Sequence, residues 1–134
     1  MSHLTTHTTI RLARPSGDLA AARAFYVDGL GLSVLYEDLT HDAFAEIIMV
    51  GIPGARWHLE LTNARIHQVV PAPTAEDLLV LYLGAPADPD LIGRLRTHGG
   101  TIVEALNPYW ERWGVTIADP DGYRLVLCER QWTA

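Results

Sequence analysis

The chain of 134 residues contains one structural pattern twice. In each half, an apolar strand-like segment is followed by a helical segment that stops at glycines, and then by three more strand-like segments. A shift of 69 residues carries Ile10 onto Leu79, Leu12 onto Leu81 and Gly31 onto Gly100. The repeat predicts two βαβββ units that pack together, because one helix covers only one face of such a sheet.

The first unit has a clearly delimited helix. Asp18 is placed to cap its N-terminus, and Leu19, Ala22 and Phe25 form an apolar face at helical spacing. The glycines at 29 and 31 predict its end. Strands are predicted at 10–12, 32–36, 44–50 and 57–61.

The second unit repeats this order. A strand at 78–83 is followed by a Pro-rich loop at 84–89, by a helix around 91–95 that ends at Gly99-Gly100, and by strands at 101–104, 114–118 and 123–128. We therefore predict one α+β domain over residues 1–134, with module one at 7–63, a linker at 64–76 and module two at 77–130. Two such modules side by side form an open barrel-like cleft; the alternative is two hairpin-rich sheets without a cleft.

Composition limits the functional classes. A formal net charge of −6 argues against nucleic-acid binding, and the chain has no run of 18 apolar residues that would cross a membrane. No secretory signal is recognisable at the N-terminus. Cys128 is the only cysteine, so no internal disulfide is possible, and a cytoplasmic location is expected.

Three motifs resemble those of one superfamily. They are FYVDGLGL at 25–32, HLELT at 58–62 and DPDGYR at 119–124. In this order on a βαβββ repeat, they are similar to the vicinal oxygen chelate superfamily, the glyoxalase/bleomycin-resistance/dioxygenase group. The resemblance implies the glyoxalase/bleomycin-resistance/dihydroxybiphenyl dioxygenase fold. Segments 10–15, 77–80, 107–110 and 114–117 resemble the YycE-like branch in particular, which brings no established reaction.

The resemblance also implies positions for a metal site. Members of the superfamily commonly hold a divalent metal through four side chains, one from each of four cleft strands, and the metal chelates adjacent substrate oxygens. The matching positions here are His7, Glu60, Glu76 and Val126. His7 is either a ligand or a solvated N-terminal histidine, and Glu76 is either a ligand or a solvated acid. Val126 has no donor atom, so we expect no complete metal site and no cofactor, with a divalent metal as the alternative.

Strand alternation predicts which other side chains line the cleft. If Ile10 and Leu12 lie in the core, Arg11 faces the cleft. Separately, Cys128 is predicted to be a buried thiol without a functional role. We predict that Glu60 pairs with an arginine in place of the metal, chiefly Arg11 and secondarily Arg124. A polar-aromatic loop at 107–113 could fold over the mouth or only cover the sheet edge. The predicted cleft residues are Arg11, His58, Glu60, Tyr82, Tyr109, Trp110 and Arg124.

Three functions compatible with these features remain open. The first is a protein that binds a small organic molecule in the cleft without a complete metal site. The second is a metal-dependent lyase, isomerase or dioxygenase in which His7, Glu60 and Glu76 hold the metal. The third is a structural or interaction module. The cleft could be completed within one chain or across a homodimer.

Overall fold

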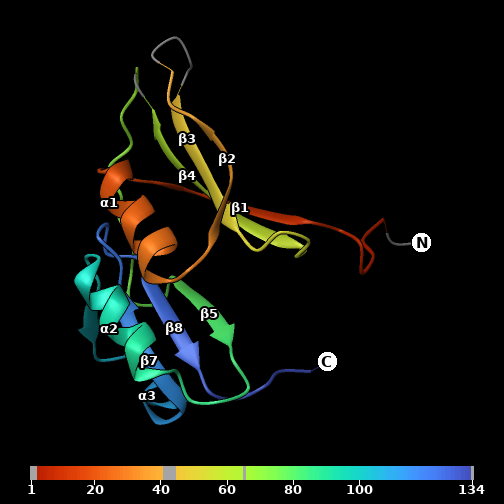
Figure 1. Cartoon of the computed structure of the whole chain (residues 1–134), viewed down its shortest axis with the longest axis vertical. Helices are drawn as coiled ribbons and strands as arrows, with labels where there is room; N and C mark the ends of the chain where they lie inside the picture. The colour runs from red at the N-terminus through yellow and green to blue at the C-terminus, as the bar shows by residue number, and fades with distance from the viewer. Residues whose placement is uncertain (1–2, 41–44, 65, 134) are drawn as a thin grey trace.

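The computed structural model describes residues 3–40, 45–64 and 66–133. Two four-stranded sheets lie one above the other, and α1 and α2 lie on the same side of the molecule (Figure 1). Module one contains β1 (Ile10–Pro15), α1 (Leu19–Arg23), the π-helical segment η1 (Ala24–Gly29), β2 (Ser33–Asp38), β3 (Ala45–Gly51) and β4 (Trp57–Ala64). Module two contains β5 (Leu78–Tyr82), α2 (Pro89–Thr97), β6 (Thr101–Val103), α3 (Pro108–Trp113), β7 (Gly114–Ala118) and β8 (Arg124–Cys128).

The strand orders of the two sheets are equivalent. They run β1-β4-β3-β2 and β5-β8-β7-β6, with the first pair parallel and the others antiparallel in each. The predicted α+β fold of two βαβββ modules is therefore confirmed. The glycine stops also recur, although the left-handed residues are Gly31 and Gly99, with φ of 89° and 91°, rather than Gly31 and Gly100.

One core serves both modules. Phe25 and Leu59 of module one belong to the same buried cluster as Leu95, Ile117 and Leu125 of module two. The main contact between the modules is formed by the helical segments η1 and α2, which lie within this shared core. Among the described residues, no helix is both long and apolar enough to cross a bilayer.

Strand β1 departs from the predicted burial. Ile10 is 63% and Leu12 is 45% exposed, although Leu12 lies opposite the buried Leu59 and shares its face of the sheet. The prediction that Ile10 and Leu12 lie in the core is wrong, because β1 is an edge strand and α1 packs over β4. The residue of this face that is buried is Arg14, which is 7% exposed.

The segment predicted as a polar-aromatic loop is largely helical. Helix α3 begins after Asn107, whose side chain accepts a hydrogen bond from the backbone N–H of Tyr109 at 3.0 Å. Pro108 occupies the first helical turn, where its missing N–H costs nothing. The Asn-Pro pair is typical of a helix start, and the prediction of a loop did not take it into account.

A buried hydrogen bond joins the modules. The hydroxyl of Tyr26, in η1, donates to Oδ2 of Asp119 at 2.6 Å. Asp119 Oδ1 accepts from the backbone N–H groups of Asp121 and Tyr123, which shapes the turn before β8. Burial raises the pKa of Tyr26 well above its ordinary value, and the nearby Asp119 raises it further. Burial also raises the pKa of Asp119.

Gly100 tests the contact between the modules. A Cβ there would lie 2.6 Å from the carbonyl oxygen of Leu95 and 2.9 Å from side-chain atoms of Ile117 and Phe25. Gly100→Ala should therefore lower the free energy of unfolding by roughly 1–3 kcal/mol in urea titrations. The control is Gly93→Ala in α2, where a Cβ meets nothing within 4 Å, and which should stabilise by about 0.5–1 kcal/mol. Equal effects of the two substitutions would contradict this packing.

Tyr26→Phe tests the buried hydrogen bond. The substitution leaves Oδ2 of Asp119 without a donor, so we expect a loss of about 1.5–3 kcal/mol in the free energy of unfolding at neutral pH. The raised pKa keeps folded Tyr26 neutral above about pH 10, where unfolded Tyr26 ionises. Its contribution to stability is therefore complete below that pH and is lost as the pH rises further.

The measurement is the free energy of unfolding as a function of pH for the wild type, Tyr26→Phe and the control Tyr36→Phe. Tyr36 is exposed on β2, so its substitution should leave both the stability and its alkaline decline unchanged. An alkaline decline of the same size in Tyr26→Phe and the wild type would contradict the assignment.

Candidate functional site

Three adjoining hollows lie where the two modules meet, around segment 75–78. Together we call them the junction groove. The first, of about 390 Å³, is bounded by β1 residues Leu12 to Arg14, by Glu76 to Leu78 and by Tyr123. The second, of about 140 Å³, shares Glu76 and Leu78 with the first and extends to residues 105–107 and Trp110. The third, of about 310 Å³, is lined by Ala75, Glu104, Ala105, Leu106 and Arg124.

The first hollow contains a buried cation. The guanidinium carbon of Arg14 lies 4.7 Å from the ring centroid of Tyr123, within the range of a cation–π interaction. The Nη1 atom of Arg14 is buried and has no hydrogen-bond partner in the part of the chain that the structure describes. Within the described ranges, no carboxylate oxygen lies within 4.0 Å of this guanidinium. The positive charge of Arg14 also lowers the pKa of Asp77, although the hydrogen bond from the backbone of Thr74 is the larger cause.

The second hollow contributes apolar surface and a free acid. Trp110 is half-buried and packs edge-on against Tyr109 and Tyr82, with ring centroids 5.0 and 6.3 Å apart. Leu106 is exposed on the opposite rim. The backbone N–H of Glu76 donates to Oγ1 of Thr74, and Glu76 is an exposed residue that lines both the first and the second hollow. The groove can therefore offer a cation at one end, an aromatic surface at the other and an acid between them.

Arg124 lines the third hollow and is held there by the chain itself. Its Nη1 donates to the backbone carbonyl of Glu104 at 3.2 Å. The predicted cleft residues Trp110 and Arg124 thus line the groove. Tyr82 and Tyr109 contact the ring of Trp110 edge-on. The hydroxyl of Tyr109 lies 3.5 Å from Arg130 Nη1.

The other predicted cleft residues lie beside the groove. Arg11 Nε donates to Nε2 of His58 at 2.9 Å, across the β1–β4 pair. The predicted Arg11–Glu60 pair is therefore not formed, because the register places Arg11 opposite His58 and places Glu60 opposite Ala13. Glu60 makes no hydrogen bond or ion pair with the described residues. Ala13 shares a face of the β1–β4 pair with Glu60 and also lines the first hollow of the groove.

The residues at the superfamily's metal positions do not fit a metal. Nδ1 of His7 lies 3.2 Å from Arg56 Nη2, beyond the start of β1, whereas Glu60 lies opposite Ala13. Three strand residues span about 10 Å, so the stretch of β1 from Ile10 to Ala13 by itself separates His7 from Glu60 by about that distance. Glu76 lies in the turn at the end of the linker, before β5. In the part of the chain that the structure describes, no three His, Cys, Asp or Glu side chains are grouped for a metal ion.

Val126 and Cys128 do not face an open cleft. Both are fully buried, on the face of β8 opposite the core residues Leu125 and Leu127. Helix α3 packs against β7 and β8, so the face of module two that corresponds to the predicted cleft is covered. The predicted burial of Cys128 agrees with this arrangement.

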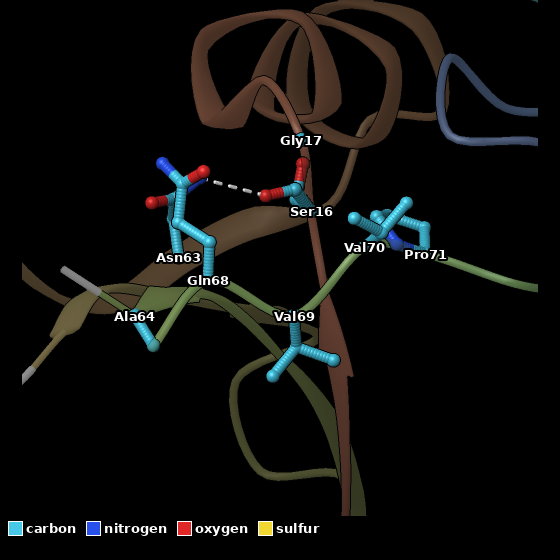
Figure 2. A pocket seen from close by; sticks show the side chains of 8 residues that line it. All are labelled: Ser16, Gly17, Asn63, Ala64, Gln68, Val69, Val70 and Pro71. Atoms are coloured by element: carbon cyan, nitrogen blue, oxygen red, sulfur yellow. Dashed lines mark hydrogen bonds between the residues drawn. The ribbon is translucent and has the colours of Figure 1, made fainter. Parts of the chain in front are cut away.

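A further hollow forms where the linker crosses module one. Figure 2 shows the linker residues Val69 to Pro71 passing Ser16, at the end of β1. Asn63 Nδ2 donates to the carbonyl oxygen of Ser16 at 2.9 Å. The hollow measures about 110 Å³, which is small for a ligand site, and none of its lining residues that the structure describes carries a charge. We interpret it as the packing of the linker.

Arg14 and Tyr123 are among the groove residues that the sequence did not predict. Arg14 lies beyond the predicted strand at 10–12 and Tyr123 was predicted only as part of the strand at 123–128, whereas the structure stacks them at the module boundary. The available signal was strand alternation, since Arg14 has the same parity as Ile10 and Leu12. Arginine side chains are usually exposed, so strand alternation alone did not lead to a prediction that Arg14 is buried.

Comparisons with known proteins agree with this architecture. The YycE-like N-terminal domain matches residues 10–62, and the YycE-like C-terminal domain matches residues 76–129. The YycE protein of Bacillus subtilis strain 168 is 40% identical over 119 residues, which are 88% of this chain and 85% of that protein.

Solved structures show the same fold. A crystal structure of a YycE protein of unknown function from Bacillus subtilis has a TM-score of 0.81 at 36% identity, covering 96% of this chain and 93% of that one. TnmS3, an antibiotic binding protein from Streptomyces sp. CB03234, has a TM-score of 0.63 at 22% identity, covering 96% and 100%. Glyoxalase I of Leishmania major has a TM-score of 0.64 at 23% identity, covering 96% and 88%. The chain therefore belongs to the YycE-like branch of the vicinal oxygen chelate superfamily, the glyoxalase/bleomycin-resistance group.

Proposed function

We propose that this protein binds a small organic molecule in the junction groove and does so without a metal. The observation that carries the proposal is a buried Arg14, whose Nη1 has no hydrogen-bond partner among the described residues, next to the apolar surface of Leu78, Leu106 and Trp110 in adjoining hollows. Ligand sites are typically concave and apolar, with a few fixed polar groups. The first hollow, at about 390 Å³, is within the usual range of their volumes.

Two further observations support binding without a metal. Val126, at the fourth metal position, has no donor and is fully buried, and His7 and Glu60 are separated along the strands. TnmS3, which shares the fold, is an antibiotic binding protein. A metal-dependent lyase, isomerase or dioxygenase would need three or more ligands in reach of one ion.

The proposal can be tested with a neutral apolar fluorophore, N-phenyl-1-naphthylamine, titrated into tag-free protein treated with EDTA. Leu106→Asp places a charge on the apolar rim of the groove and should weaken binding at least tenfold, about 1.4 kcal/mol. The matched control is Ile52→Asp, since Ile52 is similarly exposed but lies in the turn between β3 and β4. The dissociation constant of the control should equal that of the wild type.

Adding one equivalent of Zn²⁺ should leave the dissociation constant unchanged. Fluorophore binding that appears only with Zn²⁺, or stoichiometric Zn²⁺ binding by calorimetry, would favour the metal-dependent alternative. Equal weakening by Leu106→Asp and Ile52→Asp would place the fluorophore outside the groove and contradict the proposal.

A further inference from the structure

Arg14 carries a positive charge in a place where a charge is costly. It is 7% exposed, and an arginine remains protonated at any physiological pH. Removing an ion from water costs several kcal/mol unless a counter-charge or hydrogen bonds compensate it. Among the described residues, the ring of Tyr123 and the hydroxyl of Tyr26 are not anions at neutral pH, and the carboxylate of Asp77 interacts with the charge of Arg14 without forming an ion pair, so the compensation is only partial. Within the same residues, Nη1 has no hydrogen-bond partner.

The space beside Arg14 is the first hollow of the groove. Arg14 and Tyr123 line the same hollow of about 390 Å³, which opens between the free edge of β1 and the start of β5. Arg14 lines this hollow although its Nη1 is buried, so an anionic group that enters the hollow would pair with the guanidinium once the side chain turns toward it. Arginine binds a planar carboxylate well, because its N–H groups form a rigid fork of donors.

The acids of the same hollow narrow the choice of anion. Glu76 and Asp77 are both exposed at its rim, so a ligand with only negative charge would be repelled there. The Asp77 carboxylate is held by the backbone N–H of Thr74 at 2.6 Å, whereas that of Glu76 has no partner among the described residues. A protonated amine on the ligand would convert this repulsion into attraction.

The order of the protein groups along the groove indicates the order of the chemical groups in the ligand. Arg14 lies in the first hollow, Glu76 and Leu78 lie at the boundary of the first and second, and Leu106 and Trp110 lie in the second. A ligand that follows this order has a carboxylate, then an ammonium group, then an apolar or aromatic tail. We infer that the junction groove binds a zwitterionic amino acid with an apolar side chain, its carboxylate on Arg14 and its ammonium group near Glu76. This inference rests on the proposed function, because it names the ligand class of the same groove.

Three probes separate the contributions of the ligand's groups. L-phenylalanine has both charges, 3-phenylpropionate lacks the amine and 2-phenylethylamine lacks the carboxylate. By isothermal titration calorimetry of the full chain at pH 7, L-phenylalanine should bind at least tenfold more tightly than either of the others. Equal affinity for L-phenylalanine and 3-phenylpropionate would show that the amine is not recognised, and would overturn the assignment of Glu76.

Variants assign each charge to a residue. Glu76→Gln should weaken L-phenylalanine and 2-phenylethylamine about tenfold and should not weaken 3-phenylpropionate. Arg14→Gln should weaken L-phenylalanine and 3-phenylpropionate and leave 2-phenylethylamine unchanged. Glu37→Gln and Arg11→Gln make the same charge changes at exposed positions outside the groove, and should bind all three probes as the wild type does. If Arg14→Gln fails to fold by circular dichroism, the probe series and Glu76→Gln still decide the question.

The outcomes also separate this inference from the proposed function. If the neutral fluorophore binds with the expected Leu106 dependence but L-phenylalanine neither binds nor displaces it, the amino-acid assignment is wrong and the groove remains a ligand site. If neither the fluorophore nor L-phenylalanine binds, both proposals fail.

Discussion

Each βαβββ module has one sheet face that its own helix covers only in part, and the burial of that face against the other module is the constraint on which the structure depends. Phe25 packs near Gly100, where the space for a Cβ is already filled by Leu95, Ile117 and Phe25 itself. The buried Tyr26–Asp119 hydrogen bond fixes the same contact with a directional interaction. Because the modules are held through their helix-facing sides, the free edge of β1 and the start of β5 are brought to the groove without being hydrogen-bonded to each other.

The architecture was predictable because the repeat constrains it twice. Helix stops and the order of the strands around the first helix recur in both halves, so an error in one half would conflict with the other. The burial of Leu59, Leu61, Leu125 and Leu127 followed from alternation, since these central strands lie under helices. Alternation failed for Ile10 and Leu12, because it gives the face of a strand but not whether anything covers that face. Edge position is a property of the whole sheet and is not encoded locally.

The candidate site was predictable only in part. Trp110 and Arg124 line the junction groove, whereas Arg11, His58 and Glu60 share the face of the β1–β4 pair beside it. The pairing of Arg11 with His58 depends on a parallel register that no local pattern specifies. The burial of Arg14 was not predicted, because arginine side chains are rarely buried. For the same reason, its buried position points to a functional role for this residue. Helix α3 was overlooked because six residues are too few to show a helical period.

Helix α3 also has a consequence for how the two halves can change. Duplication gives both modules an equivalent sheet face, but α3 seals this face in module two, where Val126 and Cys128 are fully buried. In module one the matching face carries Arg11, His58 and Glu60, and among the described residues no helix packs on it. Mutations on the sealed face must preserve volume, because a close-packed interior accepts few shapes. Mutations on the open face carry no such penalty, so this family can vary one copy of the duplicated surface while the other retains its packing.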